Sequence, residues 1–282
     1  FPFKRYQIQK VWRGERPQDG RFREFIQADV DVVGADTLAF HHEIELPLVM
    51  VDALNKLPIP QVVVRASNRK VAQGFYEAIG IEDVAETLRI VDKLDKVGAG
   101  AVVEMLAEGV GASERQAELA LALADISGTD ASVADRIRAL GHTSQMLDEG
   151  LEELVALIEG ANELLPGSVV ADLRIARGLD YYTGSVFEST MIGHEDLGSV
   201  CSGGRYDSLV SDGKRTYPGV GLSIGVSRIV SRVLAKGLVT PSRKVPTCVL
   251  VAVNSEDERR HAEQTAMALR RRGIASDVSP GS

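Results

Sequence analysis

The segment that decides the fold reads RGERPQDGRFREF at residues 13–25. Before it, residues of different polarity alternate from Tyr6 to Trp12, which is typical of a β-strand with two different faces. The polar stretch that follows contains Pro17 and predicts a loop. Apolar residues return after this loop and extend to Val33, which predicts a second strand. The whole segment therefore predicts a long antiparallel hairpin whose loop carries charge.

The pattern farther along the chain predicts both strands and helices. Short strands are expected at residues 62–64, 168–170, 186–187 and 220–222. Helices are expected at residues 39–54, 69–79, 84–94, 146–158 and 227–236. Pro47 should kink the first of these helices or shift its start. Ser113 and Gln116 form a capping box ahead of a further helix. Because residues 83–160 are helical in pattern throughout, we interpret them as an insertion.

A small α/β domain is expected to begin after a linker at residues 241–244. Its strand, helix and second strand are predicted at residues 247–253, 255–272 and 274–275. Ser255 and Glu258 are expected to cap the helix, and this order of elements opens a βαβ unit. The chain starts at Phe1 instead of a methionine and stops as the second strand begins. We therefore expect it to be part of a longer protein.

Composition excludes several classes of protein. With 44% hydrophobic and 26% charged residues, the chain has the ordinary balance of a globular protein. No apolar run approaches the roughly 20 residues of a membrane helix, and the first residues do not resemble a signal peptide. Cytoplasm is thus the default location. Cys201 and Cys248 alone provide neither a disulfide framework nor a zinc site.

The net charge of -8 argues against a protein that coats nucleic acid generally, but not against local phosphate binding. Basic residues crowd the start of the chain, opposed there only by Glu15 and Asp19. These residues are Lys4, Arg5, Lys10, Arg13, Arg16, Arg21 and Arg23. A solvated charged hairpin is the plainer interpretation, and composition alone favours it.

The hairpin also predicts a binding site. An arginine at the end of a strand, such as Arg13, can place its planar fork on a phosphate in a bidentate manner. Gln27, Asp29 and Asp31 alternate along the return strand, so their side chains share one face. A row of acceptors of this kind suits a cationic or donor-rich small molecule.

Two further clusters combine glycine with tyrosine and arginine. Residues 177–184 read RGLDYYTG, in which the glycines permit close approach of a ligand and the tyrosine hydroxyls can donate and accept. Residues 202–207 read SGGRYD and are interpreted as a glycine turn. Residues 219–228 read GVGLSIGVSR, a glycine-rich strand that leads into a helix.

His41 and His42 are interpreted as a pair on a helix surface, because adjacent residues cannot point the same way. Taken alone, the hairpin and the glycine-rich clusters predict an anion and small-molecule site on an antiparallel sheet.

The four motifs resemble those of a known family. Residues 13–25 resemble motif 2 of class II aminoacyl-tRNA synthetases in its histidine-specific form. Residues 177–184 and 202–207 resemble the two histidine signatures of the histidyl-tRNA synthetases, and residues 219–228 resemble motif 3. The motifs occur in the family's order, and the resemblance covers nearly the whole chain.

The resemblance implies an α+β fold, with a class II catalytic domain of antiparallel sheet and flanking helices. Residues 1–82 and 163–240 would form this domain, 83–162 a helical insertion, and 245–282 part of an α/β anticodon-binding domain. The implied activity is activation of histidine with ATP to histidyl-adenylate and its transfer to tRNA-His. ATP with Mg²⁺ is expected as a substrate complex, with no tightly bound cofactor or metal site. A cytoplasmic homodimer without a membrane partner is also implied.

The resemblance also implies roles for individual residues. The catalytic residues would be Arg13, Arg177 and Arg228. Histidine would be bound by Gln27, Asp31, Tyr181, Tyr182 and Tyr206. ATP would be bound by Arg13, Glu15, Arg21 and Arg228. The candidates for contact with the tRNA acceptor end are Arg16, Gln18 and Arg23.

The sequence departs from the family pattern at several points. Ser227 stands where motif 3 usually has a glutamate, which removes a partner of Arg228. Motif 1, which builds the dimer interface, and the upstream Thr-x-Glu segment do not occur in residues 1–282. If nothing preceded Phe1, we would expect weak activity or none. The main alternative is a histidine-binding paralogue that regulates ATP phosphoribosyltransferase, and a tRNA-sensing domain of a kinase is more remote.

Overall fold

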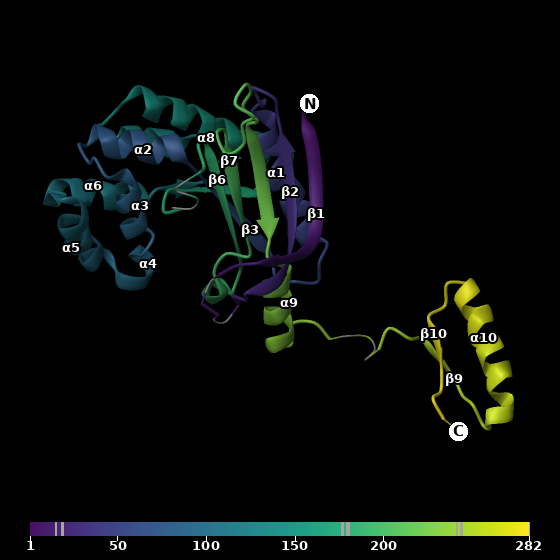
Figure 1. Cartoon of the computed structure of the whole chain (residues 1–282). Coiled ribbons are helices and arrows are strands. Elements are labelled where there is room, and N and C mark those ends of the chain that lie inside the picture. Colours follow the sequence, from purple (N-terminus) through teal and green to yellow (C-terminus); the bar gives the residue numbers. More distant parts are fainter. Residues whose placement is uncertain are drawn as a thin grey trace. The chain divides into compact units, whose positions relative to one another are not determined.

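The computed structural model describes residues 1–14, 16–17, 20–175, 178, 181–240, 242 and 245–281. It divides into a larger unit, Phe1–Lys236, and a smaller unit, Gly237–Ser282 (Figure 1). The strands of the larger unit are β1 (Phe3–Trp12), β2 (Glu24–Val33), β3 (Val62–Asn68), β4 (Ser127–Gly128), β5 (Val169–Asp172), β6 (Ser185–Met191), β7 (Cys201–Tyr206) and β8 (Gly219–Ile224). Its α-helices are α1 (His41–Asn55), α2 (Arg69–Ala78), α3 (Val84–Val91), α4 (Leu94–Val97), α5 (Ala99–Val110), α6 (Glu114–Ala124), α7 (Ser132–Arg138), α8 (Gln145–Leu164) and α9 (Val226–Ala235).

The larger unit is built on one sheet with the strand order β1-β2-β8-β7-β6-β3-β5-β4. Strands β1 and β2 pair antiparallel from Phe3 opposite Val33 to Trp12 opposite Glu24, which confirms the predicted hairpin. The other neighbouring pairs are also antiparallel, except that β3 and β5 run parallel. The predicted fold class, an antiparallel sheet flanked by helices, is confirmed.

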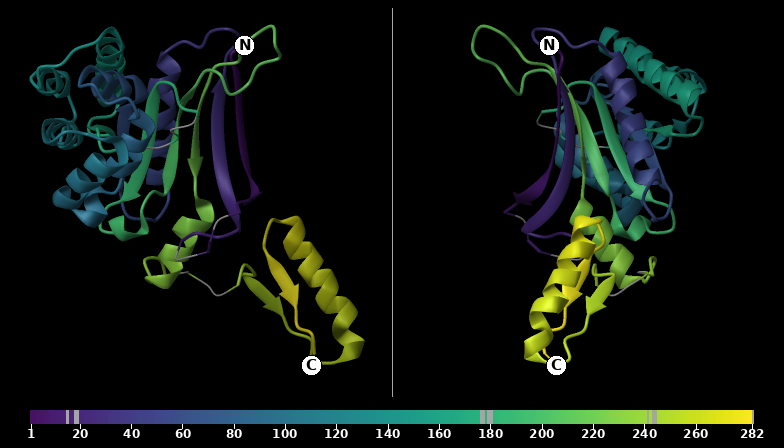
Figure 2. Two further views of the ribbon diagram at one scale, coloured as in Figure 1. Left: turned by 60° about the vertical axis from the view of Figure 1, so that its left-hand side comes forward. Right: turned by 90° about the vertical axis from the view of Figure 1, so that its right-hand side faces the viewer.

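The two faces of this sheet differ in chemistry. On one face the side chains of Val32, Leu222, Phe187 and Val64 are buried. Helices α1 and α8 pack across β8, β3 and β5 on this side, and Figure 2 shows both helices on the same side of the sheet. Because successive strand residues point to opposite faces, the residues between them face away from these helices. We call these the covered face and the open face.

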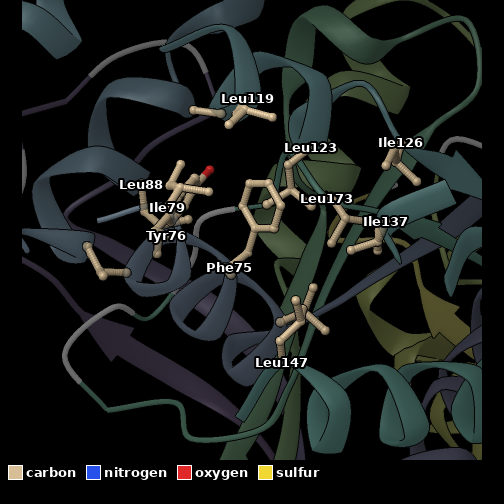
Figure 3. Close-up of a cluster of buried hydrophobic side chains, with 14 of the residues drawn as sticks. Phe75, Tyr76, Ile79, Leu88, Leu119, Leu123, Ile126, Ile137, Leu147 and Leu173 are labelled. Carbon is tan, nitrogen blue, oxygen red and sulfur yellow. The ribbon is translucent and has the colours of Figure 1, made fainter. Parts of the chain in front are cut away.

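Helices α2 to α8 form a second core beside the sheet. Phe75 of α2 lies at its centre, with Leu123, Ile137 and Leu147 packed around it from three other helices (Figure 3). The predicted capping box of Ser113 is present at the start of α6. The single helix predicted at residues 84–94 is instead two, α3 and α4.

The histidine pair of helix α1 differs from the prediction. His41 is exposed, but His42 is only 4% exposed, so the pair does not lie on the helix surface as predicted. The His42 Nδ1 lies 2.9 Å from Glu45 Oε2. The fold buries His42, and the neighbouring carboxylate of Glu45 satisfies one nitrogen of its ring. Pro47 lies inside the helix, which begins at His41.

The smaller unit begins as predicted with a βαβ arrangement. Strand β9 (Val249–Val251) pairs parallel with β10 (Ser276–Val278), and α10 (Arg259–Arg271) connects them. The expected cap at Ser255 is wrong, because its side chain caps no helix and a 3₁₀ turn at residues 256–258 precedes α10. Over the described residues of both units, no helix has the length and apolar character needed to cross a membrane.

Candidate active site

A cleft of about 1060 Å³ opens on the sheet where the β1–β2 hairpin meets α9. Arg13 and Arg21 line it from the hairpin, Gln27 from β2, and Arg228 from the first turn of α9. The cleft therefore brings together residues that lie about 200 positions apart in the chain, and three of them carry a permanent positive charge. These three arginines are suited to bind an anionic ligand.

Arg13 and Arg228 are both oriented by neighbouring groups. The Arg13 Nη2 donates to Gln27 Oε1 at 3.1 Å, and its guanidinium lies 5.1 Å from the centre of the Phe25 ring. Arg228 donates to the carbonyl oxygen of Ser199. These contacts limit the motion of the two side chains, which preorganises their charge for a ligand.

Gly20 in the hairpin loop permits the close approach of Arg228. Its φ of +67° lies in the left-handed region, and a Cβ there would lie 2.8 Å from Leu197 Cδ1 and 3.2 Å from Arg228 Nε. Any other residue would be strained and would collide with these side chains. The loop and the start of α9 thus depend on this glycine.

Ser227 occupies the position where the family pattern has glutamate. Its hydroxyl accepts a hydrogen bond of 2.8 Å from the backbone N–H of Ile26 on β2. Ser227 therefore ties the first turn of α9 to the hairpin. Arg228 next to it is oriented by the Ser199 carbonyl.

The floor of the open face is a row of polar side chains at one register of the sheet. Asp29 on β2 lies opposite Ser223 on β8, Ser223 opposite Ser202 on β7, and Ser202 opposite Glu188 on β6. The row ends at Arg65 on β3, whose guanidinium pairs with Asp172 at 2.9 Å. Directly opposed strand residues point to the same face, so this row is continuous.

Asp31 and Tyr206 meet two residues farther along β2. The Tyr206 hydroxyl donates to Asp31 Oδ1 at 3.1 Å, and Arg5 pairs with Asp31 Oδ2 at 2.8 Å. A Cβ at Gly221, which lies opposite Asp31, would be 2.1 Å from Asp31 Oδ1, so only glycine fits there. Burial raises the pKa of Tyr206 above its ordinary value, and Asp31 adds to the shift, so the hydroxyl keeps its proton.

Tyr182 lies near this pair and is partly buried. Burial raises its pKa above the ordinary value, and Tyr181 and Asp31 contribute to the shift. A Cβ at Gly178 would lie 2.0 Å from the Tyr182 ring, and one at Gly204 would lie 2.9 Å from it. The glycines therefore make room for this ring.

The interpretation of residues 202–207 as a glycine turn is wrong, because residues 201–206 form strand β7. A Cβ at Gly203 would lie 2.0 Å from the carbonyl oxygen of Gly221, and one at Gly204 would lie 2.6 Å from that of Ser185. These glycines allow the neighbouring strands and Tyr182 to approach closely. The sequence pattern predicted a turn because Gly-Gly pairs commonly mark turns.

An ion-pair cluster that sequence reasoning missed lies behind the tyrosines. Arg205 Nη1 donates to Glu43 Oε1 of α1 at 2.7 Å, and Arg205 Nε donates to Asp207 Oδ1 at 2.9 Å. Thr183 donates from its hydroxyl to Asp207 Oδ2 at 2.5 Å and from its backbone N–H to the Arg205 carbonyl at 2.9 Å. Thr183 follows Tyr182, and Arg205 precedes Tyr206. The cluster therefore fixes the backbone of both tyrosines.

The other predicted residues lie elsewhere. Tyr181 is 44% exposed and, with Tyr182, lines a second hollow of about 620 Å³ beside α2 and α8. Arg16 and Arg23 are exposed. Arg177, Glu15 and Gln18 lie outside the described residues. Among the described residues, no three His, Cys, Asp or Glu side chains are placed to hold a metal ion together.

This combination of fold and site defines a class of protein. An antiparallel sheet covered by helices on one face is the fold of the catalytic domain of class II aminoacyl-tRNA synthetases. The family described as Histidyl-tRNA synthetase matches residues 4–229. The chain belongs to this family.

Individual relatives agree with the family assignment. The histidine–tRNA ligases of Micrococcus luteus and Cutibacterium acnes are 54% and 52% identical to 99% of the chain. The chain covers 61% and 63% of their lengths, so it spans about three fifths of these relatives. The crystal structure of histidyl-tRNA synthetase from Nostoc sp. PCC 7120 superposes with a TM-score of 0.87 at 34% identity, covering 100% of this chain and 66% of that one.

Proposed function

We propose that this chain carries the catalytic centre of a histidine–tRNA ligase, which activates histidine with ATP and transfers it to tRNA-His. One observation carries the proposal. Arg13 and Arg228 line the same cleft, and its floor continues along β2 to the acceptor cluster of Asp31 and Tyr206. An anion site beside a site for a donor-rich ring is what the joining of ATP to histidine requires.

The roles of the arginines follow from their positions. Arg13 would bind the α-phosphate of ATP, and Arg228 the γ-phosphate. Arg21 lines the same cleft and would also bind ATP, together with Glu15. Arg177 would stabilise the charge that develops on the α-phosphate in the transition state. Magnesium would arrive with ATP, as part of the substrate.

The histidine side chain would lie beside Asp31, Tyr182 and Tyr206. Asp31 accepts hydrogen bonds, and a tyrosine hydroxyl that keeps its proton can donate or accept. Such a set can satisfy both nitrogens of an imidazole, whichever one carries the proton. Gln27 would bind the α-amino group, Tyr206 would close the pocket near the substrate, and Tyr181 is a further candidate for histidine binding.

The reaction needs no protein nucleophile. The histidine carboxylate attacks the α-phosphorus in line, pyrophosphate leaves, and histidyl-adenylate stays bound. A terminal ribose hydroxyl of the tRNA then attacks the carbonyl carbon and releases AMP. The enzyme would accelerate both steps by positioning the reactants and stabilising charge.

The partners of the whole protein belong to the same proposal. Arg16, Gln18 and Arg23 of the hairpin loop would contact the acceptor end of the tRNA. The smaller unit, with its parallel strands β9 and β10, would begin the anticodon-binding domain. A cytoplasmic homodimer is expected from the family.

Histidine-dependent exchange of pyrophosphate into ATP tests the proposal on the full-length protein. Exchange should require histidine and collapse in the Arg177→Ala and Arg13→Ala variants, because each removes charge at the α-phosphate. A protein that binds histidine but shows no exchange would contradict the proposal. That result would favour a regulatory role, such as the one named for the ATP phosphoribosyltransferase regulatory subunit/histidyl-tRNA synthetase from Bacillus halodurans, which shares the fold at a TM-score of 0.75.

A further inference from the structure

The side-chain amide of Gln27 has one hydrogen-bond acceptor and one hydrogen-bond donor group. The carboxamide oxygen accepts hydrogen bonds, whereas the NH₂ group donates them. Gln27 lines the cleft, so the end that faces the cleft decides which ligand group can bind there. A ligand ammonium needs the oxygen, and a ligand carboxylate or phosphate needs the NH₂ group.

Asp29 settles this orientation. Gln27 Nε2 donates to Asp29 Oδ1 at 2.6 Å, whereas Gln27 Oε1 accepts from Arg13 at 3.1 Å. A carboxylate has no hydrogen to donate, so the amide oxygen cannot take the place of the NH₂ group beside it. Arg13 likewise can only donate. The flipped amide would face an acceptor with its oxygen and a donor with its NH₂ group, and both hydrogen bonds would be lost.

Asp29 is itself held in place. The Ser223 hydroxyl donates to Asp29 Oδ1 at 2.5 Å, and Gln7 Nε2 lies 3.4 Å from Asp29 Oδ2. Both partners come from neighbouring strands, β8 and β1, at the same register. Asp29 is half-buried and is not among the residues that line the cleft. Its carboxylate can therefore act on a ligand in the cleft through Gln27.

We propose that Asp29 is a positioning residue that directs the carboxamide oxygen of Gln27 into the cleft, and that this makes the site select ligands with an ammonium group. The inference rests on the proposed function for the identity of the ligand, the α-amino group of histidine. The selectivity arises because only one amide orientation is compatible with Asp29 and Arg13 together.

The test compares two ligands that differ only in the ammonium group. Histidinol carries the imidazole, a hydroxyl and the ammonium, and its deamino analogue lacks only the ammonium. Titration calorimetry on the full-length protein measures the affinity of each. In Asp29→Leu, which removes the acceptor of Gln27 Nε2, histidinol should bind about tenfold more weakly, the size expected for one hydrogen bond to a charged group. The affinity for the deamino analogue should stay within about twofold of its wild-type value.

A swapped pair provides the rescue. In the double variant Gln27→Glu with Asp29→Asn, the amide at position 29 donates to the carboxylate at position 27, and a carboxylate oxygen again faces the cleft. Histidinol binding should recover to within about threefold of wild type. Gln9→Ala is the matched control, because the exposed Gln9 lies directly opposite Gln27 on β1. It should leave the affinity for both ligands unchanged.

The loss of a negative charge in Asp29→Leu needs its own control. Long-range attraction of the ammonium is screened by salt, whereas a short hydrogen bond to Gln27 is not. The loss of histidinol affinity should therefore persist at high ionic strength. If it disappears there, the effect is one of charge and the positioning role is wrong.

Other outcomes are equally decisive. Equal weakening of both ligands in Asp29→Leu, or no change in either, would overturn the inference while leaving the proposed function intact. Wild-type protein that binds neither histidine nor histidinol would overturn both. If Asp29→Leu does not fold, Gln27→Met replaces it, since it removes the amide and leaves Asp29 in place. That variant should lose the preference for the ammonium ligand, and a retained preference refutes the inference.

Discussion

The covered and open faces of the eight-stranded sheet are built from the same strands but are held by different forces. On the covered face, Phe187 and Leu222 are 0% and 2% exposed, and burial of apolar surface stabilises them. On the open face, Gln27, Asp29 and Ser223 are held by hydrogen bonds to one another. Within one strand, successive residues thus alternate between packing in the apolar core and forming the polar site.

This difference separates stability from chemistry. Substitutions on the covered face should change the free energy of unfolding and leave the site of the folded molecules intact. Substitutions on the open face should change binding and catalysis with little effect on unfolding. The following predictions test that division, from the largest expected effect to the smallest.

Phe187→Ala should show the largest effect on stability. The ring is fully buried on β6, and its removal leaves a cavity that costs about 3–5 kcal/mol of unfolding free energy. Urea denaturation measures this loss. Val49→Ala on α1, where the side chain is 46% exposed, is the control and should cost about 0.5 kcal/mol or less. Similar losses in both variants would show that burial of the Phe187 ring does not stabilise the fold.

Arg228→Ala should show the largest effect on activity. Loss of one preorganised cation at the phosphates should lower histidine-dependent pyrophosphate exchange roughly 10²- to 10³-fold. The urea midpoint should change little, because Arg228 lies in the cleft and outside the apolar core. Arg115→Ala on α6, with a side chain 73% exposed, tests the loss of an arginine elsewhere and should retain exchange.

Glu43 links the two faces of the sheet. It is buried on the covered face, where it pairs with Arg205, and the next residue, Tyr206, lies on the open face. Burial raises the pKa of Glu43 above its ordinary value, although Ser185 and Arg205 oppose the shift. The folded protein therefore binds this proton more tightly than the unfolded chain does. The stability that results is full below the unfolded pKa and is lost as the pH rises through the folded pKa.

Glu43→Gln should remove that pH dependence. Relative to the variant, wild-type protein should lose unfolding free energy as the pH rises from about 4 into the neutral range. Urea denaturation of both proteins across this range measures the difference. A difference that stays constant with pH, or that grows in favour of wild type, would show that Arg205 outweighs burial at this carboxyl.

Ser227→Ala should have the smallest effect. It removes the acceptor of the Ile26 N–H, which costs about 1 kcal/mol of unfolding free energy. Pyrophosphate exchange should fall only a few-fold, since Arg228 is held by the Ser199 carbonyl. An exchange rate as low as that of Arg228→Ala would mean that Ser227 itself orients the arginine.

Much of the fold could be predicted because it depends on local patterns. Alternation with period 2 predicted the β1–β2 hairpin, and Ser113 with Gln116 predicted the start of α6. The order of the four motifs predicted the family, which the match to residues 4–229 confirms. These features depend on neighbours in sequence, so a single chain displays them directly.

The site could be predicted only as a set of candidate residues. Sequence reasoning named Arg13, Gln27 and Arg228, and the cleft contains all three. Their roles remain predictions. It did not find Arg205 and Glu43, because an ion pair between residues 162 positions apart leaves no local signal. The motif at residues 202–207 shows that Arg205 precedes Tyr206, but it does not reveal the partner of Arg205.

The sequence by itself determined the hairpin, the positions of helices α1, α2, α8, α9 and α10, the βαβ opening of the smaller unit and the family. Only the tertiary structure decided that residues 201–206 form a strand, that His42 is buried, and that the amide of Gln27 turns toward Asp29. The physical reason is that these features depend on strand register and on burial by distant segments. Strand register and burial both depend on contacts throughout the fold, so neighbouring residues in the sequence do not reveal them.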